Sequence, residues 1–414
     1  MAKYTCPYCF TEHTFSEVEF RCVNGFCPEK EQDEKYANYL GMKKESMKMT
    51  NVTFPSTAKL PIFMKNKYMP VWEECPHCKM KSSLRVCPSC HNELPEGVQD
   101  NEDMIIAIVG SRDTGKTHFI SVLINELQKR ICPTVFNGTF NPMNDAVFNH
   151  YRDNFYNPVF VEKRVQDLTA SGNVRGESPV RKPLIYEMMI PLDAKGKKMR
   201  KYTFVFYDTA GEDLKNTAVM QTVNRYICKA SGLIFLLDPM QIDELRLNMT
   251  DEEVQTSSSI KENEIEPQEM VLDRIAKLIR ADKGLSKGQK ISIPTAIAFS
   301  KFDVLKRFFP RDAMVLQPSS YLREGKLDKN EWYNVSNEID AMLKEWGAGG
   351  FTKNVEMTFK NYTYCTVSAL GQQPVISEAQ KGRMIKKLQT QPRPHRVEDP
   401  FLWILKENGI IKER

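Results

Sequence analysis

The chain contains 414 residues, of which 41% are hydrophobic and 27% are charged. At ~100–200 residues per domain, this length predicts two or three domains, and the composition excludes collagen-like, fully disordered and low-complexity proteins. The net charge is only +5, so charge alone does not indicate nucleic-acid binding. No apolar run reaches the ~20 residues of a membrane helix, and the first residues lack a secretory pattern. We therefore expect a cytoplasmic protein without membrane contact.

Eight of the eleven cysteines fall in the first 90 residues as four close pairs. In a reducing cytosol such pairs favour metal ligation over disulfides. Each pair makes a tight turn that points two thiolates at one ion about 2.3 Å away, and four thiolates leave no place for water. Taken in chain order, the pairs predict two structural zinc sites: Cys6, Cys9, Cys22 and Cys27 form one, and Cys75, Cys78, Cys87 and Cys90 form the other.

The grouping of these pairs has an alternative, in which Cys6 and Cys9 share one metal with Cys75 and Cys78. Three histidines are substitute ligands, although solvated loop histidines are commoner: His13, His77 and His91. We assign residues 1–100 to a zinc-ribbon region. Such ribbons dock proteins or nucleic acids, or brace a neighbouring domain, so the metal sites do not by themselves indicate an activity.

A glycine-rich loop follows the apolar run 104–109, which suits a strand buried on both faces. The loop reads GSRDTGKT from Gly110 to Thr117, and apolar residues at helical spacing follow over 118–130. Strand, loop and helix in this order predict a nucleotide-phosphate site. Its glycines let backbone amides face the phosphates. Lys116 would bridge the β- and γ-phosphates, and the Thr117 hydroxyl would bind Mg²⁺.

Two further side chains of this loop have candidate roles. Asp113 is a candidate ligand of a monovalent cation, and Arg112 is a candidate arginine finger. The alternative is that both face solvent or form a local ion pair. The complete predicted contact set of the loop is Gly110, Arg112, Asp113, Thr114, Gly115, Lys116, Thr117 and His118.

A second strand, 201–207, is expected to pair antiparallel with residues 183–192 because a short polar turn joins them. It leads into Asp208-Thr-Ala-Gly211. The Asp208 carboxylate would hold Mg²⁺, usually through water. The Gly211 N–H would reach the γ-phosphate, so this loop would respond to the presence of that phosphate.

Two later apolar runs end in motifs that predict the base: Ser300, Lys301 and Asp303 follow the first, and Ser368, Ala369 and Leu370 follow the second. The Asp303 carboxylate would accept two hydrogen bonds from guanine N1–H and the 2-amino group, which adenine lacks. An unpaired buried carboxylate opposite adenine costs several kcal/mol. The Lys301 stem would lie along the base, and amides near Ala369 would meet O6. GTP is therefore the expected nucleotide.

In their order, the motifs over 104–370 resemble the translation-factor-related (TRAFAC) class of P-loop GTPases, and in particular bacterial double-GTPase families. The segment CPSCHNELP before the core and the terminal RVEDPFLW match that subgroup. The resemblance implies an α/β fold whose mostly parallel sheet has one antiparallel strand and helices on both faces. It also implies a GTP-hydrolysing regulatory switch in a bacterial defence or conflict system, with a protein effector or a second copy as partner.

Three positions depart from that pattern. Ser300 stands where Asn is usual, which weakens one hydrogen bond that braces the phosphate loop. Glu212 stands where many relatives carry Gln. It can accept a proton from the attacking water, yet it brings negative charge to an anionic phosphate, so we predict slow intrinsic hydrolysis. For the switch-one threonine, Thr169 is our choice over Thr134 and Thr139.

We expect the P-loop GTPase domain to cover 101–390, with insertions near 241–290 and 305–355, and a capping helix to lie within 391–414. The rival interpretation is a zinc-ribbon scaffold that binds protein or nucleic acid and keeps GTP as a structural ligand with little turnover. An ATP-specific enzyme is a third interpretation, which Asp303 disfavours.

Overall fold

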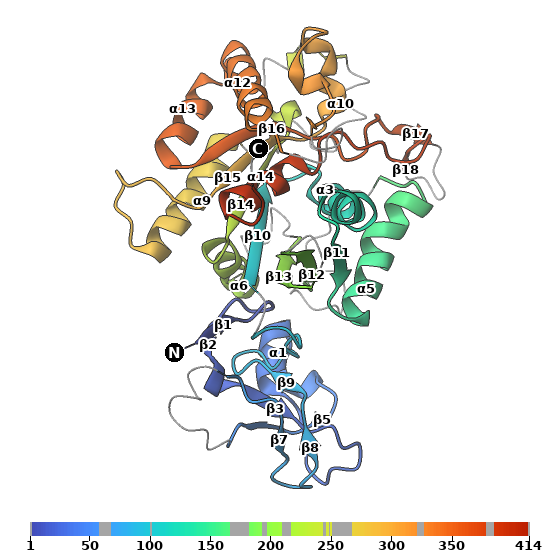
Figure 1. The fold of residues 1–414 in the computed structure, drawn as a ribbon, viewed down its shortest axis with the longest axis vertical. Helices are drawn as coiled ribbons and strands as arrows, with labels where there is room; N and C mark the ends of the chain where they lie inside the picture. The colour runs from blue at the N-terminus through green and yellow to red at the C-terminus, as the bar shows by residue number, and fades with distance from the viewer. Residues whose placement is uncertain are drawn as a thin grey trace.

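The computed structural model describes residues 2–57, 68–99, 102–165, 182–192, 197–208, 217–242, 246–247, 249–250, 267–320, 327–377 and 385–412. The described chain from residue 102 onward surrounds a seven-stranded sheet, and the N-terminal residues form a smaller body beside it (Figure 1). In spatial order the strands of the sheet are β11 (Thr139–Pro142), β12 (Leu184–Pro191), β13 (Met199–Phe206), β10 (Glu102–Gly110), β14 (Gly232–Leu237), β15 (Thr295–Phe299) and β16 (Tyr362–Thr366).

The sheet is mostly parallel, as predicted. Only β12 runs against its neighbours, because it pairs antiparallel with both β11 and β13, and the other pairings are parallel. The apolar run 104–109 is buried along β10, and all of β14 is buried. Strands of a parallel sheet are covered on both faces, which explains why their sequences are apolar without alternation.

Helices cover the sheet on both sides. In Figure 1, α6 and α9 lie on one side of β10, and α3 and α5 lie on the other. The mixed α/β architecture is thus confirmed, as are the helices expected near 118–130 and 270–280. The bounds of the helices are Lys116–Glu126 (α3), Cys132–Val135 (α4), Asp145–Tyr151 (α5), Thr217–Cys228 (α6), Gln268–Lys283 (α9), Phe302–Leu305 (α10), Lys329–Glu345 (α12), Gly349–Thr358 (α13) and Asp399–Glu407 (α14). None of the described helices has the length and apolar composition that crossing a bilayer requires.

The described part of the N-terminal body is built from very short strands, one α-helix and the 3-10 helices Phe15–Glu17 and Lys44–Ser46. A three-stranded sheet in the order β6-β3-β9 and three two-stranded pairings hold it together, and a hairpin, β17 with β18, lies near the other end of the chain. The bounds are Lys3–Thr5 (β1), Glu12–Thr14 (β2), Glu19–Arg21 (β3), Lys30–Glu31 (β4), Glu34–Leu40 (α1), Thr50–Asn51 (β5), Thr53–Pro55 (β6), Glu73–Glu74 (β7), Lys81–Ser82 (β8), Arg85–Val86 (β9), Val375–Ser377 (β17) and Ile385–Lys387 (β18).

The expected capping helix is α14, which packs directly against β14 and β15. A Cβ on Gly232 would lie 2.3 Å from the Cγ2 atom of the buried Ile404 side chain, so only glycine permits this approach. We expect Gly232→Ala to lower the free energy of unfolding by about 1–3 kcal/mol through overpacking. Urea denaturation measures this. Gly288→Ala is the matched control, because a Cβ at Gly288 meets nothing within 4 Å; equal stability of the two variants would contradict the close packing.

Candidate functional site

The functional residues gather where parallel strands end. Gly110 ends β10, and the chain continues past β13 into Asp208, past β14 into Asp238 and past β15 into Ser300. Because the carboxyl ends of parallel strands share one edge of the sheet, these residues face the same region. The strands far apart in the sequence therefore bring the predicted phosphate and base motifs to one edge.

The phosphate loop connects β10 to α3 and needs both of its glycines. A Cβ on Gly110 would lie 2.5 Å from the carbonyl oxygen of Leu236 in the neighbouring strand. Gly115 has φ +78° at the start of α3, and Asp113 has φ +62°. Such positive φ values are uncommon outside glycine, so the loop is held in a specific curled conformation at the amino terminus of a helix, the arrangement that binds anions.

The Lys116 side chain lies inside this loop. Its ammonium group donates hydrogen bonds to the carbonyl oxygens of Gly110 (3.0 Å) and Ser111 (2.7 Å), and its Nζ atom is 3.4 Å from Thr114 Oγ1. Only 8% of the residue is exposed. The positive charge of Lys116 thus lies within the loop, where it would favour negatively charged phosphate oxygens.

Thr117 and Asp208 meet beside the loop. The Thr117 hydroxyl donates to Asp208 Oδ2 over 2.9 Å, and both residues are buried. Mg²⁺ prefers oxygen ligands such as hydroxyl and carboxylate groups, so the two predicted magnesium residues are adjacent and chemically suited to the ion. Their contact joins β13 to the first turn of α3.

The first base motif is tied to its neighbours by Ser300 and Lys301. The Ser300 hydroxyl donates to the Leu237 carbonyl oxygen (3.0 Å). Lys301 Nζ lies 2.9 Å from Asp238 Oδ2 and 3.5 Å from Asp113 Oδ2. Burial lowers the pKa of Lys301, but the two carboxylates outweigh it, and the net shift of that pKa is upward. Asp113 therefore makes an ion pair that joins the phosphate loop to the base motif, while its role toward a monovalent cation stays a prediction.

Asp303 is oriented by the second base motif. The Ser368 hydroxyl donates to Asp303 Oδ1 and accepts a hydrogen bond from the Gly371 N–H at 2.9 Å. Ser368 is fully buried, whereas Asp303 is partly exposed. Ala369 and Leu370 are half-buried next to this pair. The two motifs predicted to read the base are thus in direct contact, with the Asp303 carboxylate fixed by a neighbouring hydroxyl.

A residue that the sequence analysis did not assign to the site, His395, connects both base motifs. Its backbone exchanges hydrogen bonds with Ser368 at 2.9 and 3.0 Å, and its ring stacks on Phe302 with 5.3 Å between centroids. The proline-rich sequence before it indicated a break in the chain, but nothing in it indicated this pairing, which depends on the tertiary fold.

The His118 ring is buried, and burial, which outweighs the opposing charge of Asp113 and is assisted by that of Lys301, lowers its pKa to about 4. It is therefore neutral near pH 7. Other predicted residues lie outside the described ranges: Gly211, Glu212 and Thr169. Thr134 and Thr139, the alternatives to Thr169, are exposed on α4 and β11.

The eight N-terminal cysteines form two groups of four, but not in the predicted grouping. The proximal cluster is Cys6, Cys9, Cys87 and Cys90, and the distal cluster is Cys22, Cys27, Cys75 and Cys78. The grouping in chain order is therefore wrong, as is the alternative that joins the first pair to Cys75 and Cys78. The physical reason is the antiparallel pairing of β3 with β9, which places the residues that follow these strands, Cys22 and Cys87, at opposite ends.

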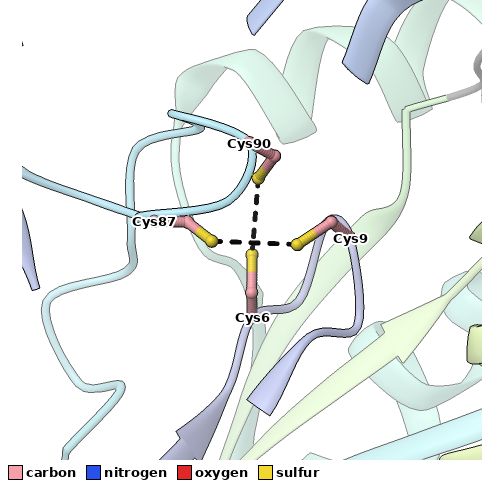
Figure 2. A group of neighbouring side chains, drawn as sticks. All are labelled: Cys6, Cys9, Cys87 and Cys90. Atoms are coloured by element: carbon pink, nitrogen blue, oxygen red, sulfur yellow. Dashed lines mark hydrogen bonds between the residues drawn. The ribbon is translucent and has the colours of Figure 1, made fainter. Parts of the chain in front are cut away.

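The geometry of both clusters fits zinc. Sulfur atoms bound tetrahedrally at ~2.3 Å from one ion lie about 3.8 Å apart. In the proximal cluster, Cys6 to Cys90 and Cys9 to Cys87 are each 3.7 Å apart between Sγ atoms, and the four side chains point to one centre (Figure 2). The corresponding distances in the distal cluster are 3.6 and 4.0 Å.

The three candidate histidine ligands are outside both clusters. His13 Nε2 lies 3.5 Å from Cys87 Sγ, next to a complete set of four thiols. His91 is held between two carboxylates, with Nδ1 2.8 Å from Asp33 and Nε2 2.7 Å from Glu19. His77 is exposed. Each described cluster consists of four cysteine side chains and no histidine.

The proximal cluster is joined to the main hydrophobic core through Phe10, the residue after Cys9. Phe10 has no exposed surface, and its ring centroid is 5.2 Å from that of Tyr226 and 6.1 Å from that of Tyr207. Tyr207 directly precedes Asp208. The N-terminal body is therefore packed into the main hydrophobic core at the strand that delivers Asp208.

No family model matches the chain. A protein of Mycolicibacterium smegmatis named "Putative ESX-1 scaffolding and assembly protein SaeC" is 24% identical over 364 residues, which cover 83% of this chain and 84% of that protein.

Three solved structures are similar at 12–14% identity. They are bacterial selenocysteine-specific elongation factor EF-Sec (TM-score 0.24, 75% of this chain and 29% of that chain), the GTPase-like domain of S. cerevisiae Ski7 bound to GTP (0.30, 75% and 51%), and Aquifex aeolicus Era bound to GDP and AlF4⁻ (0.26, 69% and 62%). The chain spans less than two thirds of each, and at these TM-scores the likeness carries no functional conclusion.

Proposed function

We propose that the chain is a guanine-nucleotide switch that binds GTP with Mg²⁺ and hydrolyses it slowly. One observation carries this proposal: Lys116 and the Thr117–Asp208 pair stand at the same sheet edge as the Asp303–Ser368 pair. The first group suits a triphosphate, and the second suits the donor edge of guanine. A site with both groups binds the two ends of one nucleotide.

The chemistry would consist of positioning and charge stabilisation. Lys116 and the loop amides would stabilise charge that develops on the phosphate oxygens. Thr117 and Asp208 would hold Mg²⁺, which neutralises phosphate charge when bound. Gly211 would respond to the γ-phosphate, and Glu212 would lie near the attacking water. The order of these parts along the chain supports this assignment.

Base selectivity tests the proposal most directly. Calorimetry with Mg²⁺ should give an affinity for GTP at least ~10²-fold above that for ATP, since two hydrogen bonds to a carboxylate contribute about 1.5–3 kcal/mol each. Asp303→Ala should remove this preference by weakening GTP binding, without weakening ATP binding. Asp312→Ala, a change at an exposed aspartate of the same segment, is the control. Equal affinities of the unaltered chain for both nucleotides would overturn the proposal.

Glu212 determines how fast hydrolysis proceeds in this proposal. If its negative charge slows attack on the phosphate, Glu212→Gln should raise the single-turnover rate of phosphate release. The rate is measured with a phosphate sensor after mixing with Mg-GTP. A slower rate in the variant would show that the carboxylate itself is the working group, which reverses the role proposed here.

A scaffold that retains GTP is the second candidate function. The similar mycobacterial protein is named for scaffolding and assembly, and the zinc-ribbon region exposes Phe26 almost completely and Trp72 by half. Exposed aromatic side chains of this kind commonly contact other proteins. Phosphate release over one turnover supports the switch, and tight GTP retention without release supports the scaffold. A protein effector or a second copy as partner, and the role in a conflict system, stay expectations.

A further inference from the structure

A hydrogen-bond network joins the phosphate loop to two glutamines from other elements. Gln241 lies just beyond β14, and Gln268 is the first residue of α9. The Ser111 hydroxyl of the loop donates to Gln241 Oε1 at 2.7 Å, and Gln268 Nε2 donates to Ser111 Oγ at 3.1 Å. Gln268 Nε2 also donates to Gln241 Oε1. Three elements of the fold therefore meet at a single loop side chain.

A contact with the loop backbone determines which atoms of the two glutamine amides donate and which accept. Gln241 Nε2 donates to the Arg112 carbonyl oxygen at 3.0 Å, so Gln241 Oε1 must face the other way, toward Ser111 and Gln268. An amide oxygen only accepts, and an amide nitrogen only donates. Gln268 must therefore present its nitrogen to the pair. The orientation of both amide groups follows from one contact with the loop backbone.

The network is largely buried. Ser111 is 2% exposed and Gln268 is 4% exposed. Among the described residues, Gln268 Oε1 is buried and accepts no hydrogen bond, which costs about 1–3 kcal/mol. The glutamine at position 268 is thus explained by its amide nitrogen, which donates to both Ser111 and Gln241. The contacts that are made, from Gln268 Nε2 and from both ends of the Gln241 amide, hold Ser111 and the Arg112 carbonyl in one arrangement.

We propose that Gln241 and Gln268 are positioning residues, which hold Ser111 and Arg112 in the conformation that directs the loop amides toward phosphate. This proposal rests on the proposed nucleotide site. The Ser300 hydroxyl donates to the Leu237 carbonyl oxygen, whereas the two glutamines contact the loop itself, from the β14 and α9 side. The two residues are 27 positions apart, and the two ends of the intervening chain therefore meet at the phosphate loop.

Gln268→Met tests the proposal because it keeps the length of the side chain and removes the donor. Stopped-flow measurements with fluorescent GDP and GTP should show about 10-fold faster dissociation of both, which corresponds to ~1.4 kcal/mol, with an unchanged GTP-to-ATP affinity ratio and an unchanged unfolding midpoint. Gln241→Met should also accelerate dissociation of both nucleotides. It replaces Gln268→Met as the test variant if that variant does not fold. Gln289→Met, at an exposed glutamine that accepts from the Ser286 N–H, should change nothing. Unchanged dissociation in both folded variants would overturn the proposal.

Hydrogen exchange separates a failure of the brace from a failure of the proposed function. The amides of residues 111–116 can be followed without any nucleotide. Faster exchange at these amides in Gln268→Met, with unchanged exchange in β15, supports the brace even if the unaltered chain binds no GTP. Equal exchange in the variant and the unaltered chain would overturn it. A general loss of stability would accelerate both regions and would likewise count against a local brace.

Discussion

Replacement of Cys87 by serine is expected to abolish metal binding at the proximal cluster and to unfold the N-terminal body. Structural zinc sites contribute about 10–16 kcal/mol to the folding of small metal-binding peptides, and the strands around this cluster are only two or three residues long. A body with so little regular structure would depend on a metal bound at these thiols for its stability. Zinc content, measured with a colorimetric chelator, should fall from two ions per chain to one or none.

The same variant should weaken nucleotide binding, because Phe10 would lose its support between Tyr207 and Tyr226. Cys228→Ser is the control, since Cys228 is a buried cysteine whose Sγ lies 3.9 Å from the Leu278 carbonyl oxygen and belongs to neither cluster. Phe10→Ala separates the two effects: it keeps all four thiols and removes the aromatic contact, at a cost of about 3–5 kcal/mol. Full metal content in Cys87→Ser would refute the assignment of the cluster.

Lys116→Ala should lower the affinity for both GTP and GDP by at least ~10²-fold, because charge-assisted hydrogen bonds contribute about 1.5–3 kcal/mol each. The lysine also donates to Gly110 and Ser111 at 3.0 and 2.7 Å, so its loss relaxes the loop as well. Calorimetry measures the affinities. Lys129→Ala, a change at a lysine beyond α3 whose Nζ lies over the Tyr156 ring, should leave them unchanged. Equal affinities for Lys116→Ala and the unaltered chain would exclude the predicted phosphate site.

The sheet and the loop were predictable because local sequence determines them. Residues 104–109 are apolar throughout, and they form a strand that is buried on both faces in the structure. Gly110 and Gly115 are required by a close approach and a positive φ. The placement of Lys116 and Thr117 beside the loop was predictable because both residues stand at the start of a helix. In each of these cases the residue type and its immediate neighbours were sufficient.

The cysteine grouping and the contacts of Gln268 and His395 were not predictable, because each depends on pairing between distant segments. Strands as short as β3 and β9 carry too little periodicity to reveal that they pair. Gln268 begins α9, where a polar residue is ordinary, and only the tertiary fold places it at Ser111. The sequence shows that Ser300 stands where Asn is usual. It does not show that the Ser300 hydroxyl donates to the Leu237 carbonyl oxygen.

The packing of Phe10 affects how the protein unfolds. The Phe10 side chain, from the first ten residues, is buried within the main hydrophobic core, where it contacts Tyr226. The N-terminal body and the main core share this buried side chain, so we expect them to unfold together. Thermal denaturation should therefore follow one cooperative transition, with coincident tryptophan-fluorescence and circular-dichroism curves. A fragment that begins at residue 101 would lack Phe10 and would expose Tyr207 and Tyr226 to water. We expect this fragment to be less soluble than the full-length chain.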